Sequence, residues 1–191
     1  MKLIDDQFIK TWKEKYLEND EEKYRDIIKL VKKDMKEIRT ISKDVFEDIY
    51  KWKTRNRSID RCDLDNYDKV QKENFSVISL LPDRVKIYVV YGLPGIRLPV
   101  ASSILHFIHP EKFPIIDVRT TRLLQKFEYL NYKGLPYSYM DHPENYNQFR
   151  TVIFGIRKSL NKEYSLREID RALFAYDSTN WDTEKKSYQK I

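Results

Sequence analysis

Apolar residues recur every three or four positions along most of this chain, which is the spacing of amphipathic α-helices. The segment from Glu21 to Ile38 follows this spacing, and so does the segment that begins at Ser42. Neither glycine nor proline, the strongest breakers of regular structure, precedes Pro82. The first part of the chain is therefore predicted to form helices over residues 6–16, 21–38, 42 to about 54, and 67–80, with a polar break at 55–66.

The middle of the chain has clearer boundaries because prolines, glycines and a capping residue mark them. Pro82 suits the first turn of a helix over residues 83–91, and Gly92-Leu93-Pro94-Gly95 ends that helix. A second helix is predicted over 98–108. Asp117 is expected to be the N-cap of a third, from Val118 to about Phe127.

Two further helices close the chain. Apolar positions at helical spacing from Tyr146 to Leu160 predict the first, and Ser165-Leu166-Arg167-Glu168 is a capping box that opens the second. After Asp177 the chain turns polar and is expected to fray. The predicted fold class is all-α.

The length of 191 residues fits one helical domain, predicted over residues 1–181, with a polar C-terminal tail at 182–191. The net charge of +6 favours an anionic partner without identifying it. No apolar run is long enough to cross a membrane, and the amino terminus lacks a signal peptide's apolar stretch. The single cysteine, Cys62, excludes an internal disulfide and a four-cysteine iron–sulfur cluster, so we expect a cytoplasmic protein without metal or other cofactor.

The turn between the helices at 83–91 and 98–108 has the chemistry of a phosphate site. Gly92 and Gly95 allow positive φ and a close approach of the backbone to a ligand. The amino end of the second helix offers unpaired N–H donors, and Arg97 adds a full positive charge. Such a turn grips a nucleic-acid backbone without reading its sequence. The alternative is an ordinary helix–helix connection with a glycine cap.

The stretch from about Val85 to Leu124 resembles the helix-hairpin-helix superfamily of DNA glycosylases, which includes endonuclease III and the adenine-specific mismatch glycosylases. That family's pattern is a Leu-Pro-Gly-x-Gly turn, an alanine in the next helix, and an aspartate about sixteen residues after the alanine. The turn here is Leu93-Pro94-Gly95-Ile96-Arg97, the alanine is Ala101 and the aspartate is Asp117. The resemblance implies a two-lobed helical bundle with a cleft between the lobes.

The resemblance also implies a reaction and a set of site residues. A glycosylase flips the target nucleotide out of double-stranded DNA, and the base–sugar bond then breaks through an oxocarbenium-like transition state. A carboxylate stabilises that charge and activates water, a role implied for Asp117 if it is more than a helix N-cap. The protein is expected to act as a monomer, near the nucleoid if it is bacterial. The implied DNA contacts in the turn are Gly92, Leu93, Gly95, Ile96, Arg97 and Pro99.

Two departures from the family pattern matter. Arg97 replaces the second glycine of the turn, and it would be strained by roughly 1 kcal/mol if that position needs positive φ. Pro99 stands where bifunctional members of the family carry a catalytic lysine, so no Schiff base can form at that position. The resemblance therefore implies a monofunctional enzyme, unless another lysine acts from elsewhere.

Basic residues cluster at Lys51-Trp52-Lys53-Thr54-Arg55 and continue to Arg61. Lys53 and Arg55 are candidate DNA contacts, and Trp52 is a candidate wall of the base pocket because aromatic faces stack on bases. The alternative is a solvated helix end with Trp52 in the core.

Arg119 shares a helix face with Arg122 and Lys126 and is a further candidate DNA contact, although runs of charge usually form solvated faces. His106 and His109 have a spacing that can bind metal on a helix, but the apolar neighbours of His106 favour a structural histidine. Cys62 is expected to be a free thiol without a catalytic role.

Two other functions remain open from the sequence. A non-catalytic module would use the same turn to bind DNA, and an RNA-binding or tRNA-handling protein could carry a similar turn. Asp117 distinguishes the non-catalytic module from an enzyme. In an enzyme, Asp117→Asn should abolish base release but leave DNA binding intact. The identity of the excised base is not encoded in these motifs.

Overall fold

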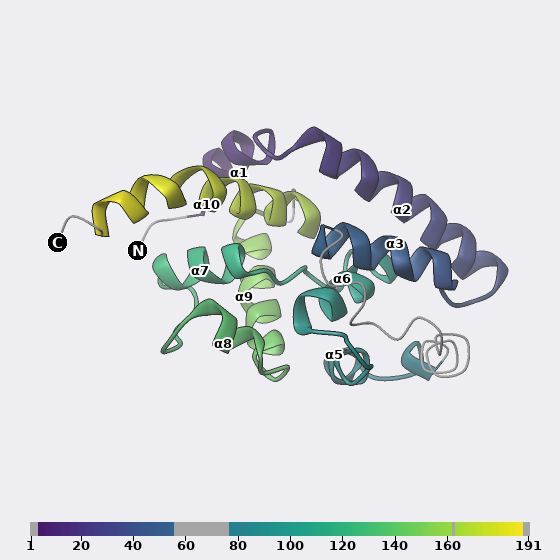
Figure 1. The fold of residues 1–191 in the computed structure, drawn as a ribbon. Helices are drawn as coiled ribbons and strands as arrows, with labels where there is room; N and C mark the ends of the chain where they lie inside the picture. Colours follow the sequence, from purple (N-terminus) through teal and green to yellow (C-terminus); the bar gives the residue numbers. More distant parts are fainter. Residues whose placement is uncertain (1–3, 56–76, 162, 189–191) are drawn as a thin grey trace.

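The computed structural model describes residues 4–55, 77–161 and 163–188, and every regular element within them is a helix (Figure 1). The predicted all-α fold class is confirmed for these residues. The helices are α1 (Asp6–Lys13), α2 (Glu18–Glu37), α3 (Lys43–Thr54), α5 (Asp83–Tyr91), α6 (Leu98–Ile108), α7 (Val118–Lys126), α8 (Pro136–Met140), α9 (Asn145–Ser159) and α10 (Leu166–Tyr188).

Most helix boundaries lie within a few residues of those that the apolar pattern predicts. The helices predicted at 83–91 and 98–108 are α5 and α6, with the same bounds. The short α8 was not predicted, because its five residues are too few to show a helical period. Cys62 and nearly all of the helix predicted at 67–80 lie outside the described residues.

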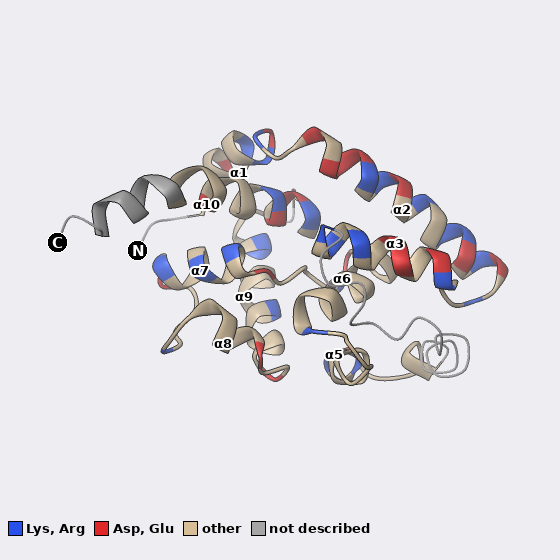
Figure 2. Cartoon of the chain, viewed as in Figure 1, with Lys and Arg blue, Asp and Glu red and all other residues tan. Residues whose placement is uncertain are grey.

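The most extensive helix contacts fall into two sets (Figure 1). In one set, α3 and α5 pack on α6, and α2 packs on α3 and α6. In the other set, α10 packs on α1, α7 and α9, and α8 lies against α7 and α9. One cluster of buried apolar side chains runs through both sets. Along the outer side of α2, acidic and basic residues follow one another in short succession (Figure 2).

The turn between α5 and α6 is anchored by its apolar residues. Leu93 and Ile96 are buried in the core, and the Ile96 N–H donates to the Leu93 carbonyl oxygen at 3.1 Å. Gly95 has a φ of 74°, a value that glycine adopts without steric strain. The strain considered for Arg97 does not arise, because Arg97 is the extended N-cap of α6 with a φ of −103°.

The expectation that the chain frays after Asp177 is wrong. α10 continues to Tyr188, and Asp177 is buried against α7. The Arg122 Nε donates to Asp177 Oδ1 at 3.0 Å, and the Arg122 guanidinium lies 3.4 Å from the centre of the Trp181 ring. Tertiary contacts, which composition does not reveal, therefore hold the helix at Asp177 and Trp181. In the described part of the chain, no helix combines the length and apolar character needed to span a membrane.

Candidate functional site

Asp117 lies at the end of an extended segment, residues 113–117, that crosses the interior before α7 begins. Ile116 is fully buried, and its N–H donates to the Ser102 hydroxyl of α6 at 3.1 Å. The Tyr146 hydroxyl of α9 donates to the Pro114 carbonyl oxygen at 2.8 Å. Two helices from different parts of the chain thus fix the start of α7 and, with it, the position of Asp117.

The Asp117 side chain uses its two oxygen atoms for different partners. Oδ1 accepts the Arg119 N–H at 2.9 Å, and the Asp117 N–H donates to the Thr120 hydroxyl at 3.1 Å, which completes a capping box. The predicted N-cap is therefore confirmed. Oδ2 accepts a hydrogen bond from the Lys53 ammonium of α3 at 3.0 Å.

The surroundings of Asp117 keep its carboxylate ionised. Burial raises the pKa of Asp117, but the Lys53 charge and the hydrogen bonds from the Arg119 N–H and Lys53 together outweigh burial, and the pKa lies below its ordinary value. Asp170 of α10 differs: burial raises its pKa, and the Arg167 and Lys53 charges only partly oppose that effect. Two acids close to Lys53 thus have pKa values that are shifted in opposite directions.

Lys53 occupies a position that the sequence pattern would assign to an apolar residue. Phe46, Ile49 and Tyr50 form the buried stripe of α3, and Lys53 continues it at the next helical step. Its side chain retains only 10% of its exposure, and Asp117 retains 21%. A lysine within an apolar stripe is a signal that predicts a buried partner for its charge. Lys53 was instead expected to contact DNA, and its pairing with Asp117 was not predicted.

A pocket of about 420 Å³, here called the turn pocket, lies between the α5–α6 turn and this ion pair. Its wall combines turn residues with residues from α3 and from the start of α7. Tyr137 and Met140 of α8 close another side. The residues that matter for its chemistry are Lys53, Gly95, Arg97, Pro99 and Asp117.

A second hollow, here called the aromatic pocket, has a volume of about 260 Å³ and shares Lys53 and Asp117 with the turn pocket. Three of its walls are the rings of Tyr16, Trp52 and Phe174, contributed by three separate parts of the chain. Its charged lining includes Asp20, Arg55, Arg119, Arg167 and Asp170. The Lys53–Asp117 ion pair therefore lines two neighbouring hollows of different character.

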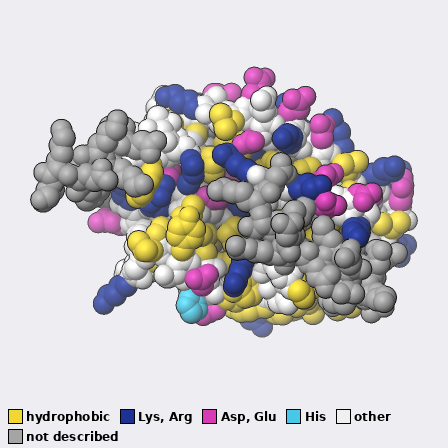
Figure 3. Space-filling model, viewed as in Figure 1, with side chains coloured by type: hydrophobic (Ala, Val, Ile, Leu, Met, Phe, Trp, Pro, Cys, Tyr) yellow, Lys and Arg dark blue, Asp and Glu magenta, His cyan; other side chains and the backbone are white. Residues whose placement is uncertain are grey.

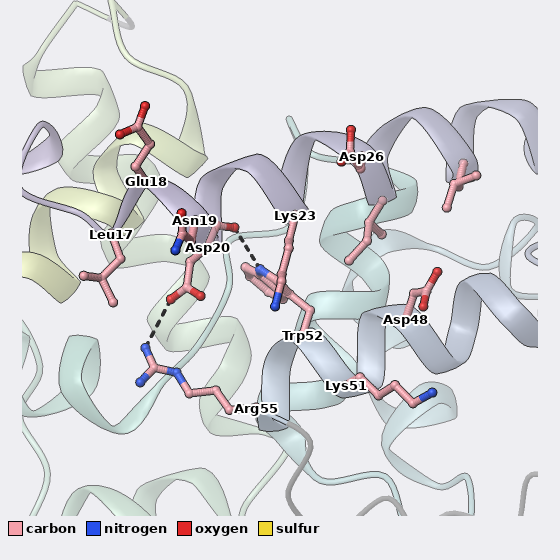
Figure 4. Close-up of a pocket in the computed structure, with 12 residues that line it drawn as sticks. Leu17, Glu18, Asn19, Asp20, Lys23, Asp26, Asp48, Lys51, Trp52 and Arg55 are labelled. Atoms are coloured by element: carbon pink, nitrogen blue, oxygen red, sulfur yellow. Dashed lines mark hydrogen bonds and ion pairs between the residues drawn. The ribbon is translucent and has the colours of Figure 1, made fainter.

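A larger hollow than either of these lies elsewhere, between α2 and α3, with a volume of about 860 Å³ (Figure 4). Trp52 points into it from α3, and the Trp52 Nε1–H donates to the Asp20 carbonyl oxygen at 3.2 Å. Acidic and basic side chains alternate around the opening, and Asp117 is not among its lining residues. Size alone therefore does not identify the chemical site, and the titratable groups favour the two smaller pockets.

The predicted contacts in the turn fall into two groups. Gly92, Gly95 and Arg97 are exposed, and Pro99 is partly exposed in the wall of the turn pocket. The side chains of Leu93 and Ile96 are buried, so these two residues offer a ligand only their backbone. Figure 3 shows Lys and Arg side chains on the same face of the molecule over the end of α3, over α7 and near the turn.

The remaining predicted residues surround the aromatic pocket. Trp52 is partly buried and packs edge-on against Phe107, with 5.2 Å between ring centres, while another part of it lines the pocket. Arg55 ends α3 and pairs with Asp20 at 3.2 Å. The Arg119 guanidinium lies over the Phe174 ring at 4.7 Å and contacts Ser178, so the solvated face considered for Arg119 and Arg122 is wrong.

His106 is a structural residue, as its apolar neighbours predict. Its Nδ1–H donates to the Phe113 carbonyl oxygen at 2.7 Å, and its Nε2 accepts from the Tyr24 hydroxyl at 2.8 Å. Both ring nitrogens are therefore occupied, and burial lowers the pKa of His106 to about 3. Among the described residues, no group of three or more acidic, histidine or cysteine side chains is placed to hold a metal ion.

Comparison of the chain with protein-family models, curated protein sequences and solved structures found no match.

Proposed function

We propose that this protein binds double-stranded DNA and breaks the bond between a damaged or modified base and its sugar, as a DNA glycosylase of the helix-hairpin-helix type. One observation carries this proposal: the Asp117 carboxylate lines the same pocket as Gly95, Arg97 and Pro99 of the turn. A group suited to stabilising a cationic sugar and a turn suited to gripping a phosphate thus border one hollow.

The turn holds the DNA backbone in this proposal. Arg97 caps α6 through its backbone, and its side chain makes no capping hydrogen bond, so the exposed guanidinium is available for a phosphate. Pro99 has no N–H, and the Val100 and Ala101 N–H groups both donate to the Arg97 carbonyl oxygen at 2.9 Å. The contact therefore depends on the Arg97 side chain and on Gly95, which lets the chain approach the phosphate closely. These contacts bring the sugar of the target nucleotide above the turn pocket.

The flipped base enters the aromatic pocket. The rings of Tyr16, Trp52 and Phe174 offer stacking surfaces, and Asp170 offers a buried carboxyl group to the edge of a base. The set formed by α2, α3, α5 and α6 is one lobe of the bundle, the set around α10 is the other, and both contribute to this cleft. Asp117 then faces the sugar carbon from which the base departs, and its negative charge stabilises the oxocarbenium-like transition state.

A screen of short duplexes, each with one altered base, tests this proposal. Hot alkali cleaves the strand wherever an abasic site has formed, so base release appears as a shortened strand. We expect cleavage of at least one duplex by the unmodified protein and a loss of about 100-fold or more in the rate with Asp117→Asn.

The matched control is Asp44→Asn, which removes an exposed acid from the first turn of α3 and should not change the rate. DNA binding is measured in parallel for all three proteins. If every protein binds DNA and none releases a base, the enzyme proposal fails and the non-catalytic module takes its place.

A further inference from the structure

This chain has no amine at Pro99, where bifunctional members of the family carry a lysine, but another part of the chain brings an amine to the site. Pro99 lines the turn pocket and can donate neither a proton nor an electron pair from its side chain. Across the same pocket, the last turn of α3 carries Lys53, whose Nζ lies 3.0 Å from Asp117 Oδ2. The amine comes from a helix that is far from Pro99 in the sequence.

The position of Lys53 creates an electrostatic conflict for a simple hydrolytic reaction. Asp117 is proposed to stabilise a positive charge on the sugar, yet a lysine ammonium already neutralises the same carboxylate. A second cation beside Lys53 would be repelled in a site that excludes much of the water. The conflict disappears if the Lys53 ammonium releases a proton to water and the neutral amine attacks the sugar carbon, while Asp117 stays ionised beside it.

We propose that Lys53 is a catalytic nucleophile, which gives this protein a strand-cleaving activity at abasic sites in addition to base release. The inference rests on the proposed function for the orientation of the DNA. It replaces the expectation of a monofunctional enzyme with a reaction in which α3 supplies the nucleophile.

The reaction balances with the groups that are present. The Lys53 ammonium releases a proton to water, and the amine adds to the aldehyde carbon C1′ of the ring-opened abasic sugar. The former carbonyl oxygen takes one proton from the attached nitrogen and one from the solvent and leaves as water, and a positively charged iminium beside the Asp117 carboxylate links Nζ to C1′. A proton on C2′ then passes to Asp117, and the C3′–O bond breaks with its electron pair leaving on the 3′ phosphate. Water hydrolyses the iminium and frees Lys53.

Borohydride trapping on a duplex with a preformed abasic site tests the proposal. Borohydride reduces an iminium to a stable secondary amine, so a Schiff base leaves the protein covalently attached to DNA. The unmodified protein should be trapped, and mass spectrometry of the digested adduct should place the DNA remnant on Lys53. Lys53→Met should lose the adduct.

Two variants separate this chemistry from folding and from nonspecific amines. Lys53→Arg retains the cation beside Asp117 but should lose the adduct, because a guanidinium does not deprotonate near neutral pH. Lys51→Met removes a partly exposed lysine of the same helix, which pairs with Glu47, and should be trapped as well as the unmodified protein. An adduct that persists in Lys53→Arg, or that maps to another lysine, overturns the proposal.

Because the abasic site is preformed, the trapping experiment tests Lys53 separately from base release. Base release without any adduct refutes the role of Lys53 and leaves the glycosylase intact. An adduct on Lys53 with no base released from any duplex supports Lys53 and refutes the glycosylase.

Discussion

Asp117 serves its helix with one oxygen atom and its pockets with the other. The N-cap hydrogen bond of Oδ1 contributes about 1 kcal/mol of stability and is a common feature of helices. The contact of Oδ2 with Lys53 is less common, because it pairs two largely buried charges at the edge of a hollow. The same residue can therefore be both a structural cap and a catalytic group.

The charge of Asp117 should stabilise the fold in a pH-dependent way. Asp117→Asn retains an N-cap acceptor but leaves the Lys53 ammonium without its anion, so we expect a loss of about 1–3 kcal/mol at neutral pH. The pKa of Asp117 is lower in the folded than in the unfolded state. The stabilisation is therefore complete above about pH 4 and is lost as the pH falls through the folded pKa.

Urea unfolding of the unmodified protein and of Asp117→Asn, at about pH 7 and at about pH 3, measures this effect. The difference between their free energies of unfolding should be smaller at the lower pH. Asp44→Asn, at an exposed position, should behave as the unmodified protein at both values. A difference that is equally large at both values would contradict the assignment.

His106 should make the fold acid-sensitive in a different range. An unfolded histidine titrates near about pH 6.5, whereas burial lowers the pKa of His106 to about 3. The unfolded state therefore binds more protons between these values, and stability falls as the pH drops below about 6.5. His106→Asn should be less stable than the unmodified protein at neutral pH, by about 2 kcal/mol. Its stability should, however, fall much less as the pH is lowered.

The measurement is urea unfolding at several values between about pH 8 and about pH 4.5. His142→Asn is the control, because His142 is exposed and should leave the slope of stability against pH unchanged. An unaltered slope in His106→Asn would show that another group causes the decline.

At the scale of elements, the turn between α5 and α6 depends on one backbone conformation. Gly95 alone of its turn has positive φ, and the buried Leu93 and Ile96 on either side hold the turn to the core. Hydrogen bonds with α6 and α9 hold residues 113–117, which lie directly before α7. The relation between turn and carboxylate therefore depends on α6, which is continuous with the turn and holds the segment before Asp117.

Two glycine substitutions should have opposite effects on stability. Gly95→Ala forces a Cβ onto a residue with a φ of 74°, and we expect a loss of about 1 kcal/mol. Gly155 lies inside α9, where an added Cβ meets no atom within 4 Å, so Gly155→Ala should stabilise the protein by about 0.5–1 kcal/mol. Thermal unfolding measures both. Equal effects of the two substitutions would contradict the role given to Gly95.

At the scale of the whole molecule, several basic side chains lie near both pockets. Lys and Arg side chains lie on the same face over α3, α7 and the turn (Figure 3), and both sets of helices contribute to the aromatic pocket. The net charge of +6 is too small to identify the partner by itself. In the proposed function, the DNA would lie across the boundary between the two sets, beside these basic side chains.

DNA binding should therefore depend on salt, and Arg97 should account for part of that dependence. Each phosphate contact contributes about one unit to the slope of log affinity against log salt concentration. Arg97→Ala should reduce the slope by about one unit on every DNA sequence. Lys33→Ala removes the same charge from an exposed position on α2 and should leave the slope nearly unchanged. Equal slopes in all three proteins would show that the turn does not contact phosphate.

Much of the local structure could be predicted because it depends on neighbours in the sequence. The bounds of α5 and α6 follow from Pro82, Gly92 and the apolar spacing, and the caps at Asp117 and Ser165 use hydrogen bonds that span two or three residues. The extent of α10 beyond Asp177 could not be predicted in this way. It depends on Arg122, which lies 55 residues away along the chain.

The sequence by itself determined most of the helices, the cap at Asp117, the presence of glycines that allow positive φ in the turn, and an acid with a motif-like spacing. Each of these depends on backbone sterics and hydrogen bonds that act over a few residues. Only the tertiary structure decided that Lys53 meets Asp117 and that their pair lines two hollows. That meeting joins residues 64 positions apart, and it depends on how apolar faces pack, which no local rule specifies.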